Sequence, residues 1–191
     1  MPIKANEVRR GQAVLYDGAL QLIMDTEHVK PGKGPAYVQA KMKNLESGTI
    51  KTNRLNSFDK LEDVSIDKRS MQFLYDGSGR GEGPWVFMDN NSYEQVEIDA
   101  DVLPRDQSQW LKENLEVVIM MYNGNALGVE LPTSIDLTVT ETSPQVRGAT
   151  ATNQLKEATV ETGARIRVPP FIENGQVVRV NPVTGEYLGK A

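Results

Sequence analysis

Residues 30–35, with the sequence KPGKGP, place one lysine where it could do chemistry. Glycines flank Lys33 on both sides and can adopt positive φ without a steric penalty, while the outer prolines restrict the backbone. Pro31, Gly32 and Gly34 therefore present the lysine away from its own backbone. A lysine ammonium offers three hydrogen-bond donors and no acceptor, which suits phosphate and ribose oxygens. The spacing alone favours a solvated lysine in a mobile loop, and a lysine that contacts phosphate or ribose is the alternative.

Other reactive side chains are scarce in this sequence. It has no cysteine, which excludes disulfides and thiolate zinc sites, and its one histidine is His28. Any serine–histidine–aspartate triad would have to use His28. The carboxylates of Asp99 and Asp101 alternate without other signs of a pocket. We therefore expect no catalytic residue, no metal site, no cofactor and no enzymatic activity.

The lysine segment joins two apolar stretches, ALQLIMDTEHV and AYVQAKMKNL, which predict the arms of a long hairpin. With arms of about eight residues at roughly 3.3 Å each, the tip stands about 25 Å beyond their base. Lys33 is therefore expected at the far end of a β-hairpin.

Short alternating apolar stretches continue along the whole chain, and helical periodicity is rare. Four strands are predicted in the first 60 residues, and the polar stretch DKLEDVSIDKRS marks a boundary near residue 64. Five strands and one short helix, DVLPRDQSQWLKEN, follow, as a small Greek-key barrel of the OB type needs. A second small barrel is expected after them. The pattern predicts an all-β chain of three modules, 1–64, 65–128 and 129–191, with a two-domain division broken near residue 64 as the alternative.

Charge is distributed unevenly over these modules. The whole chain has a formal net charge of −5. Residues 1–64 hold 10 basic and 8 acidic side chains, residues 65–128 hold 5 and 11, and residues 129–191 hold 6 and 7. An RNA partner normally needs an excess of lysine and arginine. Only the first module could face RNA without a penalty, and its excess is too small to predict RNA by itself.

The stretch HVKPGKGPAYVQAKMKNLESG resembles the N-terminal signature of the elongation factor P family. FLYDG with WVFMDNNSYEQVEI is similar to the second module of that family, and ATVETGARIRVPPFIENGQVVRVNPVTGEYLGKA to its C-terminal module. The resemblance covers nearly the whole chain. It implies an N-terminal SH3-like (KOW-type) barrel followed by two OB-fold β-barrels.

The resemblance also implies a function. Factors of this family bind the 70S ribosome between the P and E sites when peptide bond formation stalls, notably at consecutive prolines. Lys33 would then lie beside the acceptor end of the P-site tRNA, where an enzyme that modifies lysine could extend it with a β-lysyl group. Proline is a poorly oriented nucleophile, and orientation can contribute several kcal/mol to a barrier. The ribosome would remain the catalyst.

One motif departs from the family pattern. The C-terminal module of the family usually carries a Gly-Asp-Thr loop that reaches the E-site codon, and here the matching residues are Gly148, Ala149 and Thr150. The carboxylate acceptor is missing, so base reading of mRNA through it is in doubt. The elongation factor P-like paralogues also lack this aspartate, but they tend to lack the Lys-Pro-Gly-Lys-Gly tip. The factor proper is the favoured assignment and the paralogue is the alternative.

Several further side chains are expected to contact RNA. Tyr187 and Lys190 match C-terminal positions that contact small-subunit ribosomal RNA in the family, although a tyrosine in a strand more often packs in a core. Three lysines near the loop could meet tRNA phosphates, and Arg147 could pair with a phosphate beside the Gly-Ala-Thr loop. These three lysines are Lys30, Lys41 and Lys43.

The rival function is a free single-stranded nucleic-acid-binding protein built from OB barrels. It would need exposed aromatic side chains and a basic groove, and the acidic middle module argues against it. The sequence contains no run of 18 apolar residues and no signal-peptide pattern. We expect a cytoplasmic monomer without a membrane partner.

Overall fold

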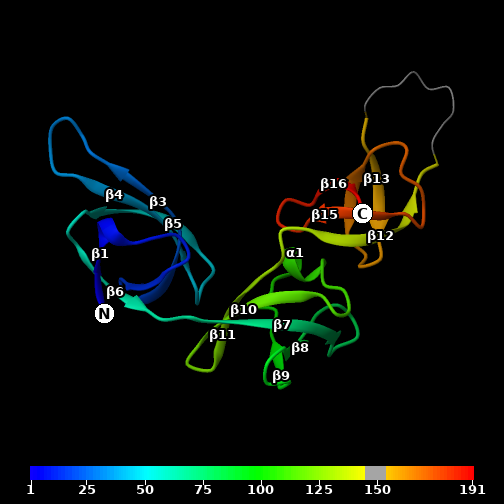
Figure 1. Ribbon diagram of the computed structural model, residues 1–191, viewed down its shortest axis with the longest axis horizontal. Helices are drawn as coiled ribbons and strands as arrows, with labels where there is room; N and C mark the ends of the chain where they lie inside the picture. Colours follow the sequence, from blue (N-terminus) through cyan, green and yellow to red (C-terminus); the bar gives the residue numbers. More distant parts are fainter. Residues whose placement is uncertain (145–153) are drawn as a thin grey trace. The chain divides into compact units, whose positions relative to one another are not determined.

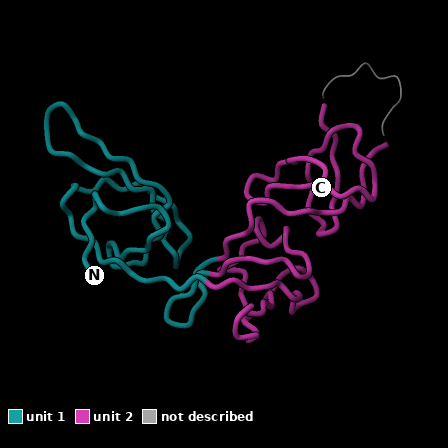
Figure 2. Tube along the Cα trace, viewed as in Figure 1, with its two compact units in different colours: residues 1–68, 120–128 teal, residues 69–119, 129–191 magenta. Residues whose placement is uncertain are grey.

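A computed structural model describes residues 1–144 and 154–191 of the chain, and in this part of the sequence strands dominate (Figure 1). The chain forms two compact units, residues 1–68 with 120–128 (unit 1) and residues 69–119 with 129–191 (unit 2), coloured separately in Figure 2. The division into three modules at residues 64 and 128 stays a prediction.

Unit 1 contains a six-stranded antiparallel sheet in the order β1-β6-β2-β3-β4-β5. A short 3-10 helix at Ala5–Glu7 follows the first strand. The strands are β1 (Pro2–Lys4), β2 (Ala13–Tyr16), β3 (Ala19–Val29), β4 (Tyr37–Asn44), β5 (Ile50–Asn56) and β6 (Lys60–Val64). The four strands predicted for this region are confirmed as β2 to β5.

The polar stretch at residues 59–70, in which a boundary near residue 64 was predicted, is mostly strand, and the boundary itself stays a prediction. Its first half is β6, which pairs with both β1 and β2, and β7 (Asp67–Asp76) begins within its second half. The stretch reads as polar because β6 contributes only Leu61 fully to the core, while its other residues are exposed or half-buried. Backbone pairing on both edges, not side-chain burial, makes it a strand.

Two apolar clusters hold unit 1 together. The inner cluster fills the space enclosed by the sheet, with Val14, Ile23, Val38 and Met42 among its buried members. The outer cluster lies on the opposite faces of β2 and β3, and its buried members are Ala13, Leu20, Leu22, Leu45 and Met120. The half-buried Tyr122 and Leu127 also pack against it. Residues 120–128, which follow the first part of unit 2 in the sequence, therefore complete the core of unit 1.

A five-stranded sheet in the order β11-β10-β7-β8-β9 forms the middle of the chain. Its further strands are β8 (Trp85–Asp89), β9 (Gln95–Ile98), β10 (Glu116–Tyr122) and β11 (Asn125–Glu130). The predicted short helix is present as α1, which spans only Arg105–Ser108. Trp110 and Leu111, just beyond it, are buried, with 3% and 8% exposure.

The C-terminal part is a closed barrel in the order β12-β13-β14-β16-β15. Its strands are β12 (Ile135–Thr142), β13 (Lys156–Val160), β14 (Arg165–Val168), β15 (Val177–Asn181) and β16 (Glu186–Lys190). Buried valines, leucines and isoleucines from alternate positions fill it, as the period of two in a strand requires. This confirms the expectation of an all-β chain. No helix in the described part of the chain is long and apolar enough to span a membrane.

Candidate RNA-facing site

The lysine loop stands on a base that three strands support. The pairing of β3 with β4 continues to Val29 opposite Tyr37, and β5 pairs with β4 as far as Asn56 opposite the same tyrosine. The sheet therefore supports the hairpin up to its last pair, and only residues 30–36 extend beyond it (Figure 1). The sequence predicted both this hairpin and the strand β5, and the structure shows that β5 pairs with β4 from Tyr37 to Lys43.

Lys33 is exposed at the middle of this loop. Its ammonium makes no hydrogen bond or ion pair with any residue in 1–144 or 154–191. Of the two flanking glycines, only Gly34 uses the left-handed region, with φ +110, and Gly32 does not. The two glycines thus have different duties, since Gly34 sets the turn and Gly32 leaves open space beside the lysine.

A stacked pair braces the base of the loop. The guanidinium carbon of Arg54 lies 3.8 Å from the centroid of the Tyr37 ring. Tyr37 is the first residue of β4 and pairs with Asn56 on β5. Arg54 lies two residues before Asn56, so its side chain is on the same face of the sheet as that of Tyr37. Such a cation–π contact contributes about 0.5–1 kcal/mol at an exposed site. Sequence reasoning missed this pair, because the contact depends on the register between β4 and β5.

The three lysines predicted to meet tRNA lie at different places. Lys30 is exposed within the loop, and Lys41 and Lys43 lie on β4 with their side chains on the same face as Tyr37. Lys41 is exposed and faces Asp25 across the strands, whereas Lys43 is half-buried beside Leu22. The structure thus brings Lys41, Lys43 and the tyrosine to one face, and their contact with RNA stays a prediction.

The candidates in the C-terminal barrel divide into two groups. Arg147, Gly148, Ala149 and Thr150 lie outside the described residues. Tyr187 is half-buried and packs against the barrel core. The ammonium nitrogen of Lys190 lies 5.3 Å from the centroid of the Phe171 ring and is otherwise exposed. The predicted RNA contacts of both residues stay untested.

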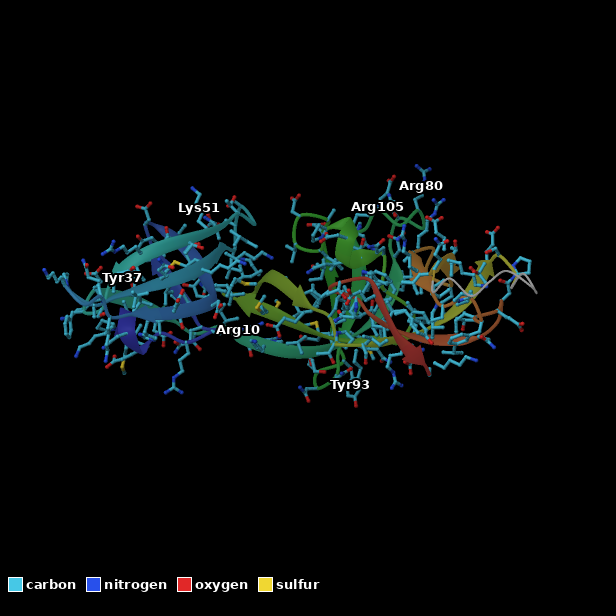
Figure 3. The ribbon with its side chains drawn as sticks, turned by 90° about the horizontal axis from the view of Figure 1, so that it is seen from above. Arg10, Tyr37, Lys51, Arg80, Tyr93 and Arg105 are labelled. Carbon is cyan, nitrogen blue, oxygen red and sulfur yellow. The ribbon has the colours of Figure 1, made fainter. Side chains whose placement is uncertain are left out.

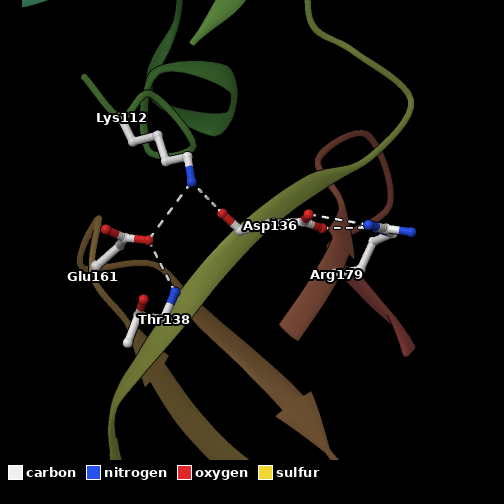
Figure 4. Close-up of polar contacts among 5 residues, drawn as sticks. All are labelled: Lys112, Asp136, Thr138, Glu161 and Arg179. Carbon is white, nitrogen blue, oxygen red and sulfur yellow. Dashed lines mark hydrogen bonds and ion pairs between the residues drawn. The ribbon is translucent and has the colours of Figure 1, made fainter. Parts of the chain in front are cut away.

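A polar network within unit 2 ties the segment after α1 to the C-terminal barrel (Figure 4). Lys112 donates a hydrogen bond to the backbone oxygen of Asp136, and its ammonium lies 3.9 Å from the Glu161 carboxylate. Glu161 in turn accepts the backbone amide of Thr138 at 2.9 Å. Arg179 donates two bonds to the Asp136 carboxylate at 2.7 and 3.0 Å. Sequence patterns did not predict this network, because its members come from four separate segments.

The ion pair between Arg179 and Asp136 shifts the pKa values of both side chains. The hydrogen bond from Arg179 holds the pKa of Asp136 below its ordinary value, against a smaller opposing effect of desolvation. The same bond raises the pKa of Arg179. Trp110 supports the network from the apolar side, since it is buried in the core cluster of the C-terminal barrel. Trp85 and Trp110 are both buried.

No cluster of three or more metal-ligating side chains occurs among residues 1–144 and 154–191. What the described residues provide is the unpaired ammonium of Lys33 at the end of a hairpin that three strands support. It can bind an anionic or hydroxyl-rich partner and hold it in place.

Three family models match the chain along its length. The elongation factor P (EF-P) KOW-like domain matches residues 4–61, the elongation factor P (EF-P) OB domain residues 66–129, and the C-terminal elongation factor P model residues 135–190. These matches confirm the predicted SH3-like (KOW-type) barrel followed by OB-type barrels.

Two solved structures are similar to parts of the chain. One is a eukaryotic translation initiation factor 5A from Methanococcus jannaschii, with 24% identity over 69% of this chain and 92% of that chain, at a TM-score of 0.48. The other is a translation initiation factor eIF-5A family protein from Naegleria fowleri, with 14% identity over 69% and 98% of the two chains, at a TM-score of 0.45. Both TM-scores lie below 0.5, so the assignment rests on the family models alone.

Proposed function

The chain belongs to the elongation factor P family and is a ribosome-associated translation factor, and on this premise we propose that it binds between the P and E sites and promotes peptide bond formation at stalled sequences, above all at consecutive prolines. Its place of action is the cytoplasm, and its partners are the 70S ribosome, ribosomal RNA and the P-site tRNA. E-site mRNA is a further proposed partner.

The observation that carries the proposal is the position of Lys33. Its ammonium is exposed and unpaired at the end of a hairpin that three strands support to the last residue pair. A cation held in this way can reach into a narrow space while its base stays fixed.

In the proposed mechanism Lys33 donates hydrogen bonds to phosphate or ribose oxygens at the acceptor end of the P-site tRNA. Holding that end in a reactive geometry lowers the barrier by an entropic contribution, and the full range for well-oriented reactants is about 7–11 kcal/mol. No proton needs to move to or from the lysine. The ribosome remains the catalyst and this chain the positioning element.

The same exposure makes Lys33 a suitable substrate for a modifying enzyme. Its amine is accessible and has no partner among the described residues. Extension by a β-lysyl group would lengthen the reach of the cation without changing the fold. Peptide mass spectrometry of the native protein tests this step directly.

The proposal is tested by a Lys33→Ala variant in a rapid-quench assay of proline–proline bond formation. The variant should lose the stimulation, while its free energy of unfolding changes by no more than about 0.5 kcal/mol because the residue is exposed. Lys51→Ala is the matched control, since it removes an exposed lysine of the same unit that lies away from the loop. Equal stimulation by the Lys33 variant and the wild type would overturn the proposal.

The rival function, free single-stranded nucleic-acid binding, finds one supporting observation. Tyr75 on β7 and Tyr93 in the connection between β8 and β9 are 53% and 72% exposed, and exposed aromatic side chains can stack with bases. Co-sedimentation with ribosomes, compared with affinity for bare oligonucleotides at the same salt concentration, separates the two functions. Binding to oligonucleotides as tight as to ribosomes would favour the rival.

A further inference from the structure

The connection between β7 and β8, residues 77–84 with the sequence GSGRGEGP, forms a second built loop tip. The Asp76 carboxylate organises it by accepting the backbone amides of Ser78, Gly81 and Gly83. It also accepts the Ser78 hydroxyl at 2.9 Å. One side chain at the end of a strand therefore fixes the whole loop from inside.

The ionised form of Asp76 suits this duty. Desolvation raises its pKa, but the hydrogen bonds from Gly81, Ser78 and Gly83 together outweigh that effect and lower the pKa below its ordinary value. The carboxylate is thus charged at neutral pH, and bonds to a charged acceptor are stronger than those between neutral groups.

Close packing holds the base of the loop. A Cβ on Gly77 would lie 2.9 Å from the backbone oxygen of Pro84, and one on Gly83 would lie 2.8 Å from the Trp85 ring. Only glycine fits at either position. Ordering so many glycines costs conformational entropy, and a loop that served only as a connection would not require it.

The residue that this loop presents is Arg80. It lies between Gly79 and Gly81, whose φ values are +65 and +76, and its backbone amide donates to the Ser78 hydroxyl at 3.1 Å. Its side chain is exposed and projects outward in Figure 3. No described residue pairs with the guanidinium.

The chemistry of Arg80 points to a phosphate. A guanidinium carries five N–H donors in a planar fork that matches phosphate oxygens in a bidentate manner. The surrounding module is acidic, with 5 basic and 11 acidic side chains in residues 65–128. Its surface therefore repels RNA except where a cation stands clear of it. A single projecting arginine can therefore contact one RNA phosphate, while the acidic surface around it prevents nonspecific RNA binding.

We propose that Arg80, on the loop fixed by Asp76, binds a backbone phosphate of ribosomal RNA and so docks the middle module. This inference rests on the proposed function, because it requires the ribosome as the partner. It assigns to the acidic module a specific contact that helps to hold the hairpin of Lys33 in place.

The test measures dissociation constants of the full chain for purified ribosomes over a range of salt concentrations. Arg80→Ala should weaken binding about five- to tenfold and reduce the slope of log K against log salt by about one, because one phosphate contact is lost. Arg80→Lys should keep the slope and recover only part of the affinity, since an ammonium cannot bind in a bidentate manner.

Two further variants make the test specific. Arg105→Ala removes the same charge from α1, whose arginine projects to the same side of unit 2 in Figure 3 but is not held in a built loop. It should weaken binding less than twofold. Asp76→Asn keeps Arg80 but loosens the loop, so affinity should fall while the salt slope stays unchanged, with thermal unfolding as the check on its fold.

The outcomes separate this inference from the proposed function. If Lys33→Ala loses stimulation and ribosome binding while Arg80→Ala keeps both within twofold of the wild type, only the inference about Arg80 is overturned. Equal losses from the Arg80 and Arg105 variants would reduce it to a general charge effect. A photo-crosslinker placed at residue 80 should label ribosomal RNA, and labelling of ribosomal protein alone would refute the phosphate assignment. A wild type that does not bind ribosomes would overturn both.

Discussion

At the scale of single residues, Lys33 and Arg80 are presented by the same kind of device. Each is a long cationic side chain between two glycines at the end of a strand connection, and each lacks a partner among the described residues. They differ in what fixes the loop. Prolines and the three-strand base hold the tip of Lys33, whereas an internal carboxylate holds that of Arg80.

The different duties of the two glycines beside Lys33 lead to a prediction. Gly34→Ala places a Cβ on a backbone with φ +110, whereas Gly32→Ala meets nothing within 4 Å and no left-handed strain. A strain of about 1–2 kcal/mol reduces the population of the native tip by a factor of about 5–30. Stimulation of proline–proline synthesis should fall by this factor in the Gly34 variant and stay near wild type in the Gly32 variant. Equal activity of the two variants would show that the tip conformation does not matter.

A second prediction at this scale concerns pH. The pKa of Asp136 is lowered from the ordinary value of 3.8 by its bond with Arg179. A carboxyl whose folded pKa is depressed stabilises the fold above its unfolded pKa, and this contribution is lost as the pH falls through the folded pKa. The melting temperature of the wild type should therefore fall more steeply below about pH 4 than that of Asp136→Asn. Parallel pH profiles for the two proteins would contradict the assigned role of the pair.

At the scale of elements, sequence patterns located most strands but not the contacts between them. The stretches with several apolar residues, such as those of β3 and β4, were predicted within a residue or two. β1 and β6 were missed, because they are defined by pairing and contribute few buried side chains. The tip of Lys33 was readable from glycine and proline spacing. The Tyr37–Arg54 stack and the Lys112 network were not, since each depends on the register between distant segments.

The loop of Arg80 provides the prediction at this scale. Gly83→Ala should lower the free energy of unfolding of unit 2 by about 1–3 kcal/mol, since its Cβ would overlap the buried Trp85 ring. Gly81→Ala has a similar positive φ but meets nothing within 4 Å, so it serves as the control for backbone strain alone. Urea unfolding followed by tryptophan fluorescence measures both, because Trp85 and Trp110 lie in unit 2. A Gly81 variant as unstable as the Gly83 variant would refute the steric explanation.

At the scale of the whole molecule, residues 120–128 belong to unit 1 although the chain reaches them only after residues 69–119 of unit 2. A fragment of residues 1–68 would therefore lose Met120 and expose the outer apolar cluster. We expect the fragment to bind a hydrophobic dye, to associate at micromolar concentration and to stimulate proline–proline synthesis far less than the whole chain. A monomeric fragment that binds no dye, measured by light scattering and fluorescence, would show that the outer cluster needs no cover.

The late position of residues 120–128 in the sequence also affects how the protein folds during its synthesis. At a synthesis rate of about 5–20 residues per second, the roughly 50 residues between the two parts of unit 1 take about 3–10 s to emerge. During that interval the nascent first barrel carries an uncovered patch around Leu20, Leu22 and Leu45. The nascent chain therefore exposes this apolar patch while it is still attached to a ribosome. We expect cotranslational chaperones to bind the chain during that interval.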